Sequence, residues 1–279
     1  MKRALPFILL TIFSLSLLAG SLNAQESYKL KYSFQKGKTY HFMNTMGGNI
    51  TQEVMGTEMK MTLNGDFSVR VVVDDVKGSK AELITSLDSG KISTTNPMKD
   101  TTMSLAPFAG KRIRITMLQD GTVENTTAID SFNMVNLQGL TQSNLLRLAK
   151  LPDGEIKAGV PWSATTTDTM DMMGSGKIMN TINSTYTIAG KEKVQGHNCL
   201  KINYTGDVKN NGQAKMGGMD LVIEGTGKIS GTFYFDPKMG MAVKNEVNMD
   251  NDMTMAVTGQ QNMIMPVSQS MKTSTQLVE

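Results

Sequence analysis

The sequence contains few of the residues on which small exported domains and enzymes depend. Cys199 is the single cysteine among 279 residues, so no disulfide can form within the chain and the fold must rest on an apolar core. Histidine occurs only at His41 and His197, and aromatic residues account for 6%. The chain also lacks a serine nucleophile elbow, a phosphate-binding loop, a dinucleotide fingerprint and a His-Glu-x-x-His zinc motif. We therefore expect a non-catalytic protein with no cofactor and no metal.

An excess of charge of either sign is also missing. The formal net charge is +3, and it falls to +1 when Lys2 and Arg3 are removed, with 26 basic residues against 25 acidic ones. The basic residues do not cluster along the sequence. A near-neutral chain without a basic patch disfavours nucleic acid as a partner.

The N-terminus has the pattern of a cleaved signal peptide at residues 1–24. Lys2 and Arg3 precede an apolar run at 5–18, and small residues follow up to Ala24. The rival interpretation is a membrane anchor, but the run is shorter than the roughly 20 residues that span a bilayer. Ser21 stands where a bacterial lipoprotein needs cysteine. We expect a periplasmic or extracellular protein without a lipid anchor and without a transmembrane segment after cleavage.

Apolar and polar residues alternate over several stretches, which is typical of strands in antiparallel sheets with one solvated face. The clearest stretches are 66–74, 111–117 and 241–249. Asn64-Gly65 and Asp120-Gly121 are strong signals for tight hairpin turns, and we expect a further hairpin tip at Asp250-Asn251-Asp252.

The pattern of the first half returns in the second half about 120 residues later. The matching segments are Gly37–Tyr40 with Gly159–Trp162, Val76–Gly78 with Val194–Gly196, and 120–123 with 239–243. The repetition predicts a first β repeat at 25–130 and a second at 159–279. Between them, 131–158 is expected to be a helical linker, with a capped helix at 141–150. The predicted fold is mainly β, with two duplicated, curved antiparallel sheets in a half-barrel or sandwich-like arrangement, joined by one helical segment.

Methionine is the compositional anomaly, with 24 residues in the chain. Many occur as Met-x-Met, a spacing that places both side chains on one face of a strand. Three interpretations are open: a methionine-packed core, an adaptable apolar surface for a ligand or partner, and a thioether site for Cu(I). Met170–Met173 with Met179 is the best local candidate for copper, although the shortage of histidine disfavours it. The residues that we expect to line a concave binding surface are Met59, Met61, Met117, Met241, Met253, Met255 and Trp162.

His197 and Cys199 share a strand face, but no neighbouring sequence feature activates a thiolate. We interpret Cys199 as a buried, inert thiol beside a surface histidine. Trp162 opens the second repeat opposite Tyr40, which is typical of a core anchor; an aromatic lip at a binding cleft is the alternative.

Two segments resemble an uncharacterised family of exported bacterial β-rich proteins, a domain of unknown function. They are Leu148–Trp162, with its Leu-Pro step and Gly-Val-Pro-Trp strand start, and Lys191–Ile202, with Val-Gln-Gly followed by Cys199. The resemblance implies an exported β-rich fold and no assigned activity. At the level of fold alone, curved sheets with a covering helix are similar to envelope lipid carriers of the lipoprotein-localisation type.

The leading hypothesis is a non-catalytic envelope protein that binds an apolar ligand, such as a lipid, or a protein partner on a methionine-lined concave surface. The alternative is a structural or assembly protein with exposed strand edges, for example at 268–278. A Cu(I)-binding protein is the third hypothesis.

Overall fold

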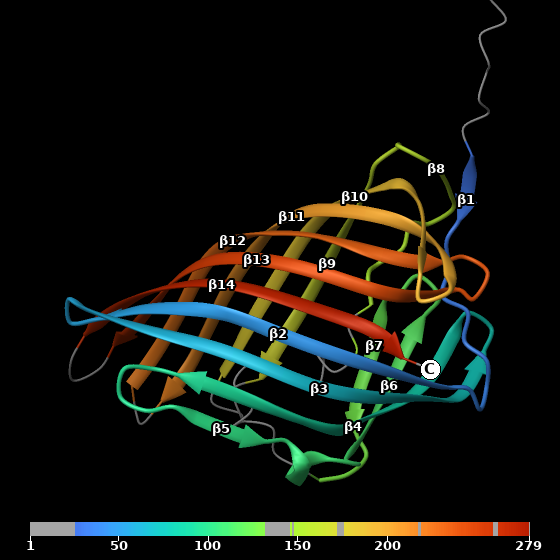
Figure 1. Ribbon diagram of the computed structural model, residues 1–279. Coiled ribbons are helices and arrows are strands. Elements are labelled where there is room, and N and C mark those ends of the chain that lie inside the picture. The colour runs from blue at the N-terminus through green and yellow to red at the C-terminus, as the bar shows by residue number, and fades with distance from the viewer. Residues whose placement is uncertain are drawn as a thin grey trace, which may run out of the picture.

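The computed structural model describes residues 26–131, 146, 148–171, 176–216, 219–258 and 262–278, and these residues form two antiparallel sheets. The large sheet has twelve strands, which follow one another in the order β7-β6-β4-β3-β2-β14-β13-β12-β11-β10-β9, with β5 paired to β4 (Figure 1). The small sheet pairs β1 with β8. The strands are β1 (Ser27–Lys29), β2 (Thr39–Val54), β3 (Thr57–Lys77), β4 (Lys80–Thr95), β5 (Thr101–Ser104), β6 (Arg112–Leu118), β7 (Val123–Ala128), β8 (Glu155–Lys157), β9 (Trp162–Asp171), β10 (Gly176–Val194), β11 (His197–Met216), β12 (Met219–Asp236), β13 (Met241–Thr258) and β14 (Met263–Val278).

The mainly β, antiparallel and curved architecture expected from the alternation is confirmed, and the sheet is open. The two predicted repeats lie in one continuous sheet instead of forming a sheet each. Strands β2 to β7 and strands β9 to β14 form two meanders, which meet where β14 pairs with β2 from Val278↔His41 to Val267↔Gln52. The glycines of the matched segments share backbone geometry, since Gly37 and Gly159 have φ of 81° and 77°.

The predicted helical linker is wrong where it is described. Residues 132–145 and 147 lie outside the described residues, so most of the expected helix at 141–150 is not covered. Leu146 and residues 148–150 are not helical, and β8 lies within the same linker. Within the described part of the chain, the single helical turn is the 3₁₀ helix η1 (Ala106–Phe108). No helix among these residues has the length and hydrophobicity needed to cross a membrane.

Long strands give the large sheet two contrasting faces. We call the face that packs against Tyr32 the inner face; in β3 it carries every second residue from Met59 to Val73. The opposite, outer face is rich in Thr, Ser, Asn and charged residues, as in β14, where Ser268, Ser270 and Lys272 are exposed. We call the end at which the β2–β3 hairpin turns the distal end (left in Figure 1), and the opposite end the proximal end.

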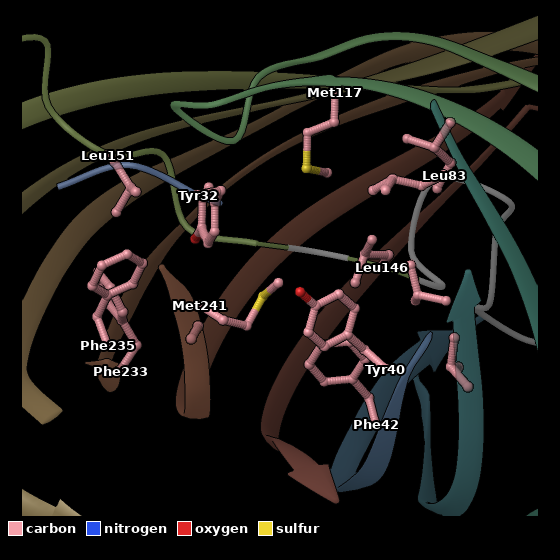
Figure 2. Packing of buried hydrophobic residues seen from close by; sticks show 14 of the residues in the cluster. Tyr32, Tyr40, Phe42, Leu83, Met117, Leu146, Leu151, Phe233, Phe235 and Met241 are labelled. Carbon is pink, nitrogen blue, oxygen red and sulfur yellow. The ribbon is translucent and has the colours of Figure 1, made fainter. Parts of the chain in front are cut away.

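At the proximal end, the chain itself fills the curve of the sheet. Tyr32, Leu146 and Leu151 lie between side chains from both meanders, with Met117 on one side and Phe233 on the other (Figure 2). We call Leu146 and residues 148–151 the strap. The strap is fixed by hydrogen bonds from the Tyr32 hydroxyl to the Ala149 carbonyl, 2.8 Å, and from the Leu151 N–H to the Asp120 carbonyl, 2.8 Å. One continuous core therefore joins both repeats.

Two of the three expected turns are wrong. Asn64-Gly65 lies inside β3, and Asp250–Asp252 lies inside β13. The Asp120-Gly121 turn is confirmed between β6 and β7, and Gly121 there has φ of 88°. The β2–β3 hairpin turns instead at Met55-Gly56, where both residues have positive φ, 51° and 75°.

Candidate functional site: a methionine surface at the distal end

The inner face becomes rich in methionine towards the distal end. Strand register places Met59 opposite Gln52, Gln52 opposite Val267, and Val267 opposite Met253, so this row crosses β3, β2, β14 and β13. The next row distally pairs Met255 with Met265. We define the distal methionine surface as the half-buried inner-face residues Met59, Met61, Met219, Met253, Met255 and Met263.

Beneath part of this surface lies a second, smaller apolar cluster. Its buried members are Ala214, Leu221, Ile223, Val257 and Met265, and the half-buried residues packed against it are Val54, Ile178, Met219, Met255 and Met263. Val54 on β2 and Ile178 on β10 are separated by four strands in the sheet order, so the cluster extends across six neighbouring strands of the sheet. The strap at 146–151 belongs to the proximal core and is absent from this cluster.

Glycines give the inner face room for long side chains. A Cβ on Gly225 would lie 2.5 Å from Cγ of Met253, so the Met253 side chain lies across this glycine. Gly227 in the same way leaves space for Asn251, whose Oδ1 would be 2.6 Å from an added Cβ. A sheet with this curvature has a crowded inner face, and the missing side chains relieve the crowding.

A buried polar pair separates the proximal core from the distal cluster. Nδ2 of Asn210 donates a hydrogen bond of 2.8 Å to Oδ1 of Asn251, and both side chains are buried on the inner face. The hydrogen bond satisfies one donor of Asn210 and the acceptor of Asn251, which lowers the cost of burying both amides. It divides the inner face into two apolar regions of different character.

The proximal region is closely packed around the described residues of the strap. A cavity of about 10 Å³ lies there, lined by Phe42, Leu148, Ala149, Phe233, Ala242, Lys244, Asn245 and Thr275. This is close to the smallest volume that holds one water molecule. The half-buried distal methionine surface is therefore the candidate site on the inner face.

The structure divides the seven predicted lining residues into two groups. Met59, Met61, Met253 and Met255 lie together on the distal inner face. Met117 and Met241, which are 0% and 1% exposed, lie in the packed proximal core, where they fill space and line no surface. Trp162 also belongs to the proximal core, where its ring stacks on Tyr186 with centroids 5.2 Å apart. Met219 and Met263 belong to the surface but were not predicted, and strand register is the signal that identifies them.

Residues 172–175 and the side chain of Met170 lie outside the described residues. The local copper candidate at 170–173 is thus not covered. Met179, its fourth methionine, is 47% exposed on the outer face of β10.

His197 and Cys199 lie on the outer face, far along the sheet from the distal surface. Nδ1 of His197 is 3.0 Å from Oδ2 of Asp236, whose other oxygen accepts the N–H groups of Lys238 and Met239. Burial raises the pKa of the Cys199 thiol to about 11, and the nearby negative charge of Asp236 adds to the shift. A nucleophilic cysteine needs the opposite shift, so the thiol is not activated.

The outer face carries two shallow polar grooves. One of about 570 Å³ crosses β11 to β14 and is bordered by Lys209, Glu224, Asp252 and Ser268. The other, about 530 Å³, crosses β12, β13, β14 and β2. In the described residues no group of three or more His, Cys, Asp or Glu side chains is placed to hold a metal ion.

The predicted exposed edge at 268–278 is wrong, because β14 is paired with β13 on one side and β2 on the other. Within the described part of the sheet, the unpaired edges belong to β7, to β9 and to the short strand β5, which pairs with β4 alone. The C-terminal strand β14 thus lies inside the sheet. We call its pairing with β2, which joins the two meanders, the seam.

Comparison with known proteins identifies no relative. No protein-family model and no curated protein matches the sequence. Among solved structures, an outer membrane channel from Pseudomonas putida F1 is similar with a TM-score of 0.29 and 9% identity over 88% of this chain and 97% of that chain. OpdQ from Pseudomonas aeruginosa has a TM-score of 0.27 and 7% identity, covering 87% of this chain and 100% of that one. A DUF1329 family protein from Desulfovibrio piger has a TM-score of 0.16 and 11% identity, covering 82% and 83%. Similarity at this level carries no argument about function.

Proposed function

We propose that the protein is a non-catalytic, exported binding protein that holds an apolar ligand, or an apolar segment of a protein partner, on the distal methionine surface. The observation that carries the proposal is the register of β3, β2, β14 and β13. It gathers half-buried methionines onto one face, at the end opposite the core in which the described residues of the strap pack. Export, to the periplasm or beyond, rests on the signal pattern of residues 1–24.

Methionine suits such a surface for a physical reason. Its unbranched side chain has three rotatable bonds and a polarisable sulfur, so it adapts to ligands of variable shape. Leu or Ile at the same positions would have fewer accessible side-chain conformations, so the surface would adapt less to the shape of a ligand. Because the inner-face positions of the surface carry no ionised side chain, a linear acyl chain is the ligand that fits best.

The test uses cis-parinaric acid, a fluorescent fatty acid whose emission rises in apolar surroundings, with palmitate as competitor. We expect saturable binding, and we expect Met253→Asp to weaken it at least about tenfold, since a buried unpaired carboxylate costs more than the 1.4 kcal/mol that this factor represents. Met253→Leu keeps the volume and apolarity of the site, so its affinity should stay within about threefold of wild type.

Met98→Asp is the matched control, because Met98 is 86% exposed in the turn between β4 and β5. Thermal unfolding of each variant shows whether the fold is intact. Absence of saturable binding, or equal loss in Met253→Asp and Met98→Asp, would contradict the proposal. Binding of a peptide but not of the fatty acid would favour the protein-partner form.

A further inference from the structure

Four methionines of the distal cluster lie in one contact group. They are Met219 on β12, Met255 on β13, and Met263 and Met265 on β14, and every other member of the cluster is Ala, Val, Leu or Ile. Met265 is buried, while the other three are half-buried and reachable from solvent. A purely packing role does not require sulfur at four adjoining positions.

Strand register brings three of these sulfur atoms within reach of a common point. Met255 and Met265 are directly opposite one another, and the Cβ atoms of such a pair are about 5 Å apart. Met263 precedes Met265 by two residues on the same face, opposite Val257. The flexible side chains can therefore turn these three thioethers towards one centre, whereas Met219 lies further along β12, beyond the Ile223 that is opposite Met255.

The sulfur of Met265 already engages a polar partner. Nε2 of Gln52 donates a hydrogen bond to Sδ of Met265 at 3.5 Å. This contact places the Met265 sulfur on the side of the cluster that faces β2.

The ligand set selects the ion. Thioethers are soft ligands that select Cu(I) and bind hard divalent ions poorly, and the cluster contributes no carboxylate, imidazole or thiolate. We infer that Met255, Met263 and Met265 form a binding site for a soft monovalent cation of the Cu(I) or Ag(I) class. The site differs from the 170–173 candidate of the sequence. It goes beyond the proposed function, because it needs thioether sulfur where apolar binding needs only apolar volume.

Leucine substitution separates the two roles, since Leu keeps the apolar volume and removes the sulfur. Purified protein is titrated anaerobically with Cu(I) in competition with bicinchoninate, and native mass spectrometry with Ag(I) gives the stoichiometry. We expect one ion per chain, bound at least about tenfold more weakly by Met255→Leu/Met265→Leu, since loss of even an outer-shell partner costs a metal site this much. Met265→Leu alone, at a buried position outside the distal methionine surface, should weaken Cu(I) binding and leave the affinity for cis-parinaric acid unchanged.

Met117→Leu/Met241→Leu is the matched control, because it removes two sulfurs from the proximal core and should leave Cu(I) affinity unchanged. Met263→Leu, at a half-buried position, provides a milder test if the double variant unfolds. Cys199→Ala should also bind normally, and loss of binding there would assign the metal to the thiol and overturn the inference. Failure to compete with bicinchoninate, or equal weakening in both double variants, would overturn it as well.

Discussion

At the residue scale, the methionines divide by their position along the strands. Met117 and Met241 share the proximal core with Leu146 and Leu151, whereas Met253 and Met255 are half-buried and lie outside that core. Alternation in the sequence predicted correctly that all four occupy apolar strand positions. It did not show where the covering segment ends, because that depends on contacts between Leu146, Leu151 and strands distant in sequence.

The single cysteine supplies a prediction at the same scale. Burial and Asp236 raise the pKa of Cys199 from 9.0 to about 11, so the native thiol should resist 5,5′-dithiobis-(2-nitrobenzoic acid) at pH 8, whereas the guanidinium-unfolded chain should react with one equivalent. Rapid labelling of the native protein would contradict the buried assignment.

The raised pKa also sets the sign of a pH effect. Between pH 9 and 11 the unfolded thiol ionises while the folded thiol stays protonated, so the contribution of Cys199 to stability is complete below this window and is lost as the pH rises through it. Denaturant unfolding of wild type and Cys199→Ala across that range measures the difference.

At the scale of the element, two turn predictions were wrong because the residues on which they rest lie inside strands and contribute to packing. Gly65 lies in the middle of β3, where an added Cβ would be 2.9 Å from Cγ of Met46, so this glycine makes room for a neighbour. Asn251 in β13 is buried and bonded to Asn210. Asn-Gly and Asp-rich segments indicate turns only when the flanking strands pair with each other, and this pairing is not readable from a local window.

The actual β2–β3 turn carries an unfavourable residue. Met55 has φ of 51°, a left-handed conformation that costs an ordinary residue about 1 kcal/mol and asparagine much less. Met55→Asn should therefore stabilise the protein by about 1 kcal/mol, raising Tm by roughly 2–4 °C. Gln195→Asn should act similarly at the β10–β11 turn, where φ is 49°.

Met43→Asn is the control for this pair, because Met43 is 41% exposed on the outer face of β2 in extended backbone. It should give no gain in Tm. An equal rise in Met43→Asn and Met55→Asn would show that polarity, and not turn geometry, is responsible.

At the scale of the whole molecule, the duplication predicted the strand content of each half but not how the halves join. The seam is the long pairing of β14 with β2, a contact between residues more than 200 positions apart. Both meanders also contribute to one proximal core, with Leu83 and Met117 from the first and Ile202 and Phe233 from the second. Nothing in a local pattern encodes such a pairing, because two similar meanders can equally stack face to face.

The shared core and seam predict that neither half is stable alone. A fragment of residues 159–279 would expose the edge of β14 along twelve paired residues, Val267–Val278, together with the apolar residues that face the first meander. We expect it, and the complementary fragment 26–158, to show no cooperative thermal unfolding when prepared separately. Refolded together at equal concentration, they should form a one-to-one complex with the near-ultraviolet circular dichroism of the intact chain. A monomeric fragment 159–279 with its own cooperative transition would show that each repeat folds as a separate domain.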